Sequence, residues 1–328
     1  MMNKRLKQGT TFLLALALAF PLLTLPGARA ANAIDTDQKC SVAFNVSGKY
    51  NELTADGTNI TVNLYKVADV DVSGNYTATK DFTGLDVSSV RADNNDAASE
   101  WAARAKEAQK LLKDSVIPTA TVPLTGGIGA KAGLDTGLYL VDTPEVVTTN
   151  YTYTFTPYLV SLPTNNYYSN GNDTWIYDLT DTNAVGLKPE EHARYGDLKI
   201  NKRLANHNAT TGKKATFVFQ IEINKTETRI ESLDFEAAGD SSVTITKIPA
   251  GAKVKVTEVY SGASYKLTSA NDQTATIVAT DRGSTNTPAS VSFTNDIDDN
   301  MNGGYGVKNN FKLNENGQYQ YTEPAEKN

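Results

Sequence analysis

The chain has 328 residues, with 31 basic and 37 acidic side chains and a formal net charge of −6 at pH 7. Binding to phosphate needs clustered lysine and arginine, so this acidic balance argues against nucleic acid as a partner. One cysteine and two histidines leave little material for a metal site, a catalytic triad or thiol chemistry. A hydrophobic content of 40% permits packed cores, and the length suggests two domains.

The first thirty residues have the order of a secretory signal peptide. Basic residues precede an apolar run over residues 12–25, and residues 28–30 (ARA) supply a small-x-small cleavage pattern. A membrane anchor is the alternative, but the run is short and is broken by Pro21. Removing residues 1–30 takes away four positive charges and no negative ones, which makes the mature net charge −10. We expect a secreted protein whose mature chain does not span the membrane.

Export makes the single cysteine informative. Disulfides persist in exported proteins, but Cys40 has no second cysteine to pair with in this chain. We expect Cys40 to be a small buried hydrophobic residue, and intermolecular pairing is the alternative. Within this chain, the stability of the folded protein must therefore come from interactions other than intramolecular disulfides.

Most of the mature chain alternates apolar and polar residues between Gly, Asn and Asp turns, which predicts strands. The predicted strands are residues 60–67, 138–141, 151–155, 158–162, 173–179, 197–202, 216–223, 242–248, 253–260, 274–279 and 290–295. Residues 97–115 instead space their apolar side chains as a helix does, and Pro118 follows them. We interpret this helix as a core-facing insertion between strands, with a separate binding device as the alternative.

A domain boundary is predicted near residue 188, because residues 188–192 (KPEEH) are polar and lack a strand pattern. The fold class is therefore all-β, with two tandem β-sandwiches over residues 31–188 and 189–300, the first containing the helix. A tail over residues 301–328 has Asn316-Gly317 between alternating segments, which predicts a hairpin over residues 311–321. We expect this hairpin to pack on its own sandwich or on a neighbouring subunit.

Three polar residues in the second half fall where an apolar side chain is expected. Side chains alternate across a strand with a period of two, so Lys202 extends the inward face of Leu198 and Ile200. In the same way, Glu258 shares a face with Val254, Val256 and Tyr260, and Asn295 shares one with Val291 and Phe293. The alternative is that all three lie at strand ends, where the face opens to water.

A buried lysine, carboxylic acid and carboxamide have a specific chemistry available to them. Burial disfavours charged forms, so it lowers the pKa of a lysine and raises that of a carboxylic acid. A neutral amine is a nucleophile and can attack the carboxamide carbon while the acid polarises its oxygen and relays protons. Ammonia then leaves, and a lysine–asparagine isopeptide bond remains.

The second half resembles the Cna B-type, immunoglobulin-like domains of Gram-positive surface proteins and pilins. The resemblance covers residues 196–296 and rests on three segments, GDLKINK at 196–202, VKVTE at 254–258 and VSFTN at 291–295. In that family the first-strand lysine, a glutamate and the last-strand asparagine form an autocatalytic isopeptide. The resemblance implies that Lys202 and Asn295 are joined and that Glu258 catalyses the reaction.

The first half resembles the N-terminal domain of sortase-assembled pilins. The segments concerned are VNLYKVAD at 62–69, GLYLV at 137–141, YLVSLP at 158–163 and WIYDL at 175–179. Such pilins carry a lysine after the Trp strand that attacks the thioester between sortase and the next subunit. Lys188 is the candidate here, although it lies in Leu187-Lys188-Pro189-Glu190 rather than Tyr-Pro-Lys-Asn, and a plain linker lysine is the alternative. Lys66 shares an inward face with Leu64, but no last-strand asparagine matches it.

The resemblance implies a structural subunit of a cell-surface pilus, with other pilin subunits and a sortase as partners. The chain ends without a Leu-Pro-x-Thr-Gly-like motif, an apolar segment and a basic tail; VPLTG at 122–126 lies inside a domain and is interpreted as chance. The competing function is a monomeric surface or secreted adhesin. A secreted hydrolase is disfavoured because no catalytic constellation is recognisable, and we expect no enzyme activity toward other molecules.

Several weaker signals are interpreted structurally. Residues 69–74 (DVDVSG) begin like a calcium loop, but the twelfth position is Lys80, so a hairpin turn is the better interpretation. Residues 296–300 (DIDDN) are interpreted as a solvated linker rather than a calcium site. His192 and His207 are predicted to lie in polar loops without partners. We therefore expect no metal site and no cofactor.

Overall fold

The computed structural model describes residues 33–46, 48–88, 97–113, 115–165, 174–180, 184–209, 214–262, 264–281, 283–298, 310–313 and 319–322. The chain divides into unit 1, Met1–His192, and unit 2, Ala193–Asn328. The predicted signal peptide lies outside the described residues. No helix in the described ranges is long and apolar enough to cross a membrane.

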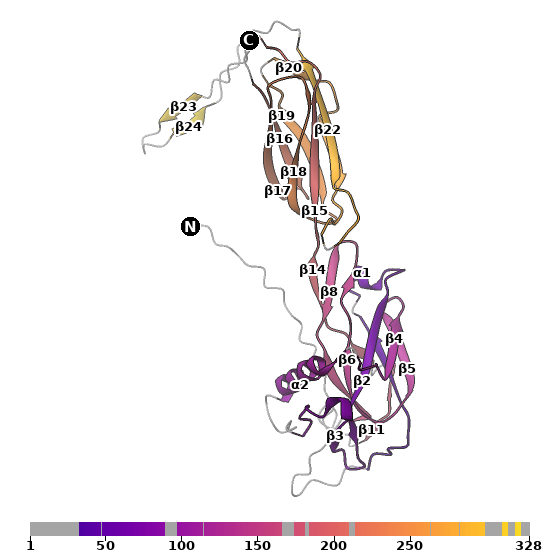
Figure 1. Cartoon of the computed structure of the whole chain (residues 1–328). Helices are drawn as coiled ribbons and strands as arrows, with labels where there is room; N and C mark the ends of the chain where they lie inside the picture. The colour runs from indigo at the N-terminus through magenta and orange to yellow at the C-terminus, as the bar shows by residue number, and fades with distance from the viewer. Residues whose placement is uncertain are drawn as a thin grey trace. The chain divides into compact units, whose positions relative to one another are not determined.

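Unit 1 is built mainly from strands (Figure 1). Its largest sheet has the order β3-β2-β6-β9, and β4 pairs with the other half of β2. The bounds are β2 Ile60–Val70, β3 Tyr76–Ala78, β4 Ala120–Leu124, β6 Gly137–Asp142 and β9 Tyr158–Leu162. Between β2 and β3, the Asp71 carboxylate accepts hydrogen bonds from the backbone N–H groups of Ser73 and Asn75, at 2.8 and 2.9 Å. Residues 71–74 thus lie in the turn of the β2–β3 hairpin and residues 69 and 70 are the last paired residues of β2, so the predicted hairpin is confirmed.

A second sheet of unit 1 faces the first across an apolar core. In this sheet β1, Cys40–Asn45, pairs with β5, Ile128–Leu134, and in parallel with the short strands β12, Asp178–Leu179, and β13, Val185–Gly186. Alternating residues of β1, including Val42 and Phe44, pack in one buried cluster with Val62 and Leu64 of β2. The remaining elements of unit 1 up to β13 are α1 Asn51–Thr54, the 3₁₀-helix η1 Lys80–Phe82, β7 Val146–Val147, β8 Tyr151–Phe155, β10 Thr164–Asn165 and β11 Trp175–Ile176.

The inserted helix α2, Ala97–Leu111, packs on the outer face of the β2-containing sheet. Its inward residues Trp101, Ala105 and Ala108 are buried against Leu140 of β6 and Leu159 of β9. The helix is therefore the predicted core-facing insertion, but it ends four residues before the predicted position. The sequence after Leu111 is Leu112, Lys113, Asp114 and Ser115, and Asp and Ser side chains generally compete with the backbone for helical hydrogen bonds.

Two strand predictions for unit 1 were wrong. Residues 173–179 were predicted as one strand, but β11 pairs with β10 and β12 pairs with β1, with the break at Tyr177. Residues 188–192 were predicted to lack a strand, but β14, Pro189–Ala193, joins β8 and β7 in a three-stranded sheet. The polar composition of β14 misled the prediction, because four of its five residues are exposed and need no apolar alternation.

Unit 2 is an immunoglobulin-like sandwich of two four-stranded sheets (Figure 1). One sheet has the order β18-β15-β22-β20 and the other the order β17-β16-β19-β21. The bounds are β15 Tyr195–Leu204, β16 Ala215–Ile223, β17 Glu227–Phe235, β18 Gly239–Pro249, β19 Lys253–Tyr260, β20 Tyr265–Leu267, β21 Asp272–Thr276 and β22 Ala289–Ile297. The all-β fold class with a helix in the first unit is therefore confirmed.

The first and last strands of the sandwich are parallel neighbours. β15 pairs with β22 from Leu198↔Ala289 to Leu204↔Asn295, so the C-terminal ends of both strands lie side by side. The inward residues of both sheets form one buried cluster that includes Ile200, Phe217, Phe219 and Phe293. β22 continues to Ile297, so residues 296 and 297 are strand rather than the predicted linker.

The tail contains the predicted hairpin. β23, Asn310–Leu313, pairs with β24, Tyr319–Thr322, in antiparallel register with Phe311 opposite Tyr321. The Asn316-Gly317 turn itself lies outside the described residues.

Candidate functional site

Lys202, Glu258 and Asn295 are the polar residues of unit 2 buried in its central core. Their exposed fractions are 1%, 4% and 0%. Lys202 lies on β15 and Asn295 on the parallel neighbour β22, displaced by two positions along the register. Glu258 lies on β19 in the facing sheet. The strand ends at these positions do not open to water, so the three side chains meet between the sheets.

The three side chains form a closed set of hydrogen bonds. Lys202 Nζ donates to Glu258 Oε2 at 2.5 Å and also to Asn295 Oδ1 in a short contact. Asn295 Nδ2 donates to Glu258 Oε1 at 2.7 Å. Each carboxylate oxygen thus has one partner, and the amine lies directly beside the carboxamide.

Aromatic rings surround the amine. The Lys202 nitrogen lies 4.3 Å from the ring centroid of Phe217 and 5.8 Å from that of Phe219. Phe219 in turn packs against Phe293 of β22, with ring centroids 5.2 Å apart. These rings were not predicted as part of the site, although Phe217 and Phe219 follow the inward alternation of residues 216–223. A low-dielectric surrounding strengthens the electrostatic contacts inside it.

The surroundings of Lys202 disfavour its charged form. Burial holds the pKa of Lys202 below its ordinary value of 10.5, while the hydrogen bond and the charge of Glu258 oppose that shift. The desolvation of the ammonium is the larger effect, because the side chains of both residues are fully inaccessible to solvent. The geometry therefore offers a proton acceptor, Glu258, to an amine that burial inclines to lose a proton.

A β-bulge follows Glu258 and corrects one part of the sequence prediction. Glu258 pairs with Phe219, but Tyr260 pairs with Val218, so Val259 is an extra residue in β19. Tyr260 was predicted on the inward face and is 45% exposed, and Val259 is 50% exposed. A bulge reverses the alternation of the residues after it, which strand parity alone does not anticipate.

The other lysine candidates have different surroundings. Lys188 is exposed between β13 and β14, and its backbone carbonyl accepts a hydrogen bond from Thr156 N–H at 3.2 Å. Lys66 is half-buried on β2, and its Nζ lies 2.6 Å from the exposed carboxylate of Asp69. Among the described residues, neither amine donates a hydrogen bond to a carboxamide as Lys202 does to Asn295.

Cysteine and histidine do not add a second site among the described residues. Cys40 is a free, buried thiol, and burial raises its pKa to about 11, which keeps it protonated. His192 was predicted to have no partner, but it lies on β14 with its Nε2 3.1 Å from Thr154 Oγ1. His207 packs beside the ring of Tyr265. The described part of the chain contains no group of three or more His, Cys, Asp or Glu placed to hold a metal ion.

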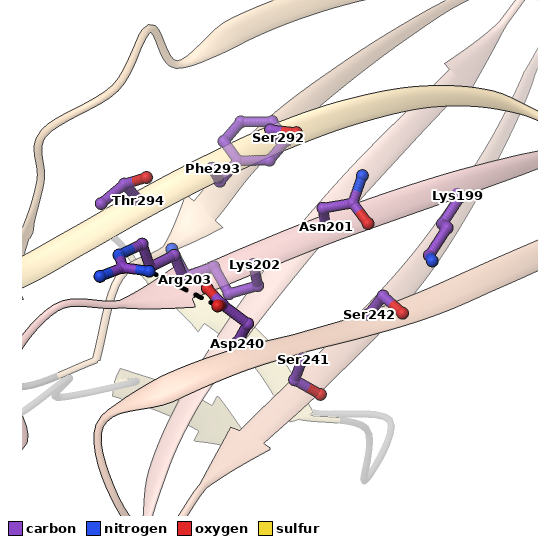
Figure 2. A pocket seen from close by; sticks show the side chains of 10 residues that line it. All are labelled: Lys199, Asn201, Lys202, Arg203, Asp240, Ser241, Ser242, Ser292, Phe293 and Thr294. Atoms are coloured by element: carbon purple, nitrogen blue, oxygen red, sulfur yellow. Dashed lines mark hydrogen bonds and ion pairs between the residues drawn. The ribbon is translucent and has the colours of Figure 1, made fainter.

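A shallow groove of about 450 Å³ lies on the opposite surface of the β15 sheet (Figure 2). Figure 2 shows Lys199, Asn201 and Arg203 on the near side of this sheet, with Lys202 and Phe293 behind the ribbon. Arg203 pairs with Asp240 at 3.5 Å, and both side chains are mostly exposed. The groove is thus separated from the buried amine by the sheet itself.

One family of known proteins matches part of unit 2. Residues 198–298 match a family described as a domain of unknown function, DUF5979, and this match spans the sandwich from β15 to β22. No curated protein matches the chain significantly.

Solved structures similar to the chain include Gram-positive pilins. A streptococcal ancillary pilin is 11% identical with a TM-score of 0.26, and the match covers 79% of this chain and 69% of the pilin. The full-length major pilin SpaD from Corynebacterium diphtheriae is 11% identical with a TM-score of 0.25, covering 83% of this chain and 100% of SpaD. The Bacillus anthracis TIE protein is 12% identical with a TM-score of 0.30, covering 79% of this chain and 34% of that protein. Similarity at this level gives no residue-by-residue correspondence, and the site rests on its own geometry.

Proposed function

We propose that the chain is a structural subunit of a Gram-positive cell-surface pilus whose unit 2 is closed by an isopeptide bond between Lys202 and Asn295. The observation that carries this proposal is the buried set of an amine, a carboxyl group and a carboxamide between two sheets. An ordinary buried ion pair needs no carboxamide beside the amine. Replacing such a pair by apolar residues is often neutral or stabilising, so its retention in a core suggests a task other than packing.

The proposed reaction uses only these three side chains. Glu258 Oε2 takes a proton from Lys202 Nζ, and the neutral nitrogen attacks Cγ of Asn295. Glu258 returns the proton to the Asn295 nitrogen, to which it is hydrogen-bonded through Oε1, and the C–N bond of the carboxamide breaks. The former Lys202 nitrogen then gives its second proton to the Glu258 carboxylate, so the products are the isopeptide bond, ammonia and a protonated Glu258. One amide is lost and one is formed, one ammonia leaves, and no oxidant or cofactor is consumed.

The position of the bond suits a protein that carries tension. Lys202 and Asn295 lie 93 positions apart in the chain but on adjacent parallel strands. A force that enters at the N-terminal end of β15 would pass through the bond and leave through the end of β22, without loading strands β16 to β21. By analogy with a disulfide that closes a loop of this length, the bond would also lower the entropy of the unfolded chain and so raise the free energy of unfolding by about 4–5 kcal/mol. Unlike a disulfide, it resists reduction.

Mass measurement of the chain expressed from residue 31 tests the proposed bond. We expect the intact mass to be lower than calculated by one ammonia, and a tryptic digest to contain Lys202 and Asn295 in one branched peptide. Glu258→Ala should restore the full mass, because the proton carrier is gone. Glu222→Ala, a carboxyl on the outer face of β16, is the matched control and should keep the reduced mass. A wild-type chain of full calculated mass would refute the bond.

The proposed polymer uses a second lysine. Lys188 is exposed, follows β13, and precedes β14, so its amine is accessible to a sortase-bound neighbouring subunit. Lys188→Ala should leave a folded monomer and abolish the high-mass ladders that survive boiling in detergent. Lys199→Ala, an exposed lysine of unit 2, is the control that should leave them unchanged. If the ladders persist in Lys188→Ala, another residue forms the linkage between subunits. If wild-type cells contain no ladders, the result favours a monomeric adhesin.

A further inference from the structure

The backbone of Glu258 lies at the point where regular pairing of β19 ends on both sides. On the β21 side, the ladder stops at the pair Thr257↔Asp272, one residue before Glu258. On the β16 side, the pair of Glu258 with Phe219 is the last before the bulge at Val259. The catalytic carboxyl of the proposed reaction is therefore attached two residues before the end of β19, beside the bulge, where local opening is easier than in the regularly paired part of the strand.

A side chain replaces the missing backbone partner. The Glu258 backbone N–H donates to Oδ1 of Asn271 at 3.0 Å. Asn271 is exposed and immediately precedes β21, so its carboxamide occupies the place that the next backbone carbonyl of a longer strand would take. After Glu258 only the pair Tyr260↔Val218 continues the ladder beyond the bulge, and the side chains of Val259 and Tyr260 are about half exposed.

We infer that Asn271 is a positioning residue for Glu258: it fixes the end of β19 so that the carboxyl group stays between Lys202 and Asn295. This inference rests on the proposed isopeptide bond. It assigns Asn271 a role in the rate of bond formation rather than in the bond itself. Nothing in the strand pattern of the sequence identifies Asn271, because the residue belongs to a turn and acts on a backbone group.

The neighbouring residue offers a matched comparison. Thr257 Oγ1 donates to Asp272 Oδ1 at 2.8 Å, across the same two strands and one position away. Thr257→Val removes that hydrogen bond at nearly constant shape but leaves the backbone of Glu258 tied. Asn271→Ala removes the acceptor for Glu258, and Asn271→Asp keeps an oxygen at the same position.

The test follows bond formation in the chain from residue 31, made by a short pulse of cell-free synthesis and then chased. Aliquots are quenched in acid, and the branched Lys202–Asn295 peptide is quantified by mass spectrometry. We expect Asn271→Ala to form the bond roughly two- to tenfold more slowly, the range that the loss of one hydrogen bond predicts. Thr257→Val and Asn271→Asp should react at nearly the wild-type rate.

Melting temperatures separate positioning from general stability. The same variants are measured with Asn295→Ala added, so that no bond forms in any of them. A slow reaction of Asn271→Ala with a melting temperature equal to that of Thr257→Val supports the inference. A wild-type rate in Asn271→Ala, or rates that simply follow melting temperature across the variants, would overturn it while the proposed bond stands. A wild-type chain without the branched peptide overturns both.

Discussion

Two lysines in this chain each extend a row of apolar residues on one face of a strand, but their burial and their polar partners differ. Lys66 follows Leu64 on β2 of unit 1, and Lys202 follows Ile200 on β15 of unit 2. The Lys202 side chain is fully buried and bonded to two polar groups. The Lys66 side chain is 21% exposed and pairs with the carboxylate of Asp69, which is 66% exposed. The same sequence pattern thus gives a buried cluster of amine, carboxyl group and carboxamide in one unit and a partly exposed ion pair in the other.

Local backbone geometry and the facing sheet explain this difference. The β2–β6 register shifts between Lys66 and Ala68, which tilts the strand at this point. A Cβ at Gly137 would lie 2.5 Å from Lys66 Cε, so the glycine leaves the space through which the lysine stem passes toward Asp69. Lys202 instead meets Glu258, which enters from the opposite sheet. Burial of Lys202 is tolerated because a carboxyl group on the facing sheet pairs with its amine, and Lys66 has no such partner among the described residues.

The largest expected effect comes from removing the amine of unit 2. Lys202→Met keeps an unbranched stem of similar length and leaves Glu258 and Asn295 bonded to each other, so the main loss is the proposed cross-link. We expect the free energy of unfolding of unit 2 to fall by about 4–5 kcal/mol. Circular dichroism in guanidinium measures this loss. The fluorescence of Trp101 and Trp175, both in unit 1, should show an unchanged transition. An unchanged unit 2 transition would contradict the proposed cross-link.

The pKa of Lys202 predicts how stability depends on pH when the bond is absent. Asn295→Ala prevents the bond and keeps the amine beside Glu258. Because burial lowers the pKa of Lys202 below 10.5, the unfolded state binds more protons between the lowered value and 10.5, so stability rises with pH in that window. The slope reaches at most about 1.4 kcal/mol per pH unit. Guanidinium unfolding between pH 8 and 10 measures it. The double variant with Lys202→Met should lack this rise, and equal slopes would contradict the shift.

Replacing the aromatic ring nearest the Lys202 amine should lower the stability of unit 2 by less than removing the amine does. Phe217→Leu keeps an apolar side chain but removes the ring under the amine and its edge contact with Phe235, at 5.7 Å between centroids. Phe217 also packs against Tyr265, with ring centroids 5.6 Å apart. We expect unit 2 to lose about 1–3 kcal/mol, from an imperfect swap and two lost aromatic pairs. Phe235→Leu removes the aromatic pair with Phe217 without a ring contact to Lys202. If both variants form the bond equally fast, the ring under the amine has no part in the reaction.

The smallest effect is expected at Lys66. Lys66→Met removes an ion pair with a largely exposed partner, and such pairs contribute less than about 1 kcal/mol. The tryptophan fluorescence transition of unit 1 should therefore move little, and the intact mass should change only by the substitution. A loss comparable to that of Lys202→Met would show that Lys66 has a partner of its own and would remove the contrast between the units.

Strand alternation in the sequence was enough to predict that Lys202, Glu258 and Asn295 face the core, although it failed for Tyr260 after the bulge. Alternation with period two is a local property of the strand backbone, so residues 198–202 and 291–295 already directed Lys202 and Asn295 inward. The sequence also predicted the helical insertion and the turn at Asp71, because helical spacing and turn residues are local signals that extend over only a few residues. These signals hold without knowledge of any distant segment.

Which of the inward residues contact one another could be seen only in the folded structure. Strand pairing over long separations in the chain placed β15 beside β22 and put β19 opposite them, which brought one carboxyl group to both an amine and a carboxamide. The contact of Asn271 with Glu258 joins a turn side chain to a backbone N–H, which strand alternation does not reveal. The bulge at Val259 and the strand β14 likewise depend on backbone hydrogen bonds to distant segments. Such bonds leave no periodic trace in the side chains, because the groups that make them are the same in every residue.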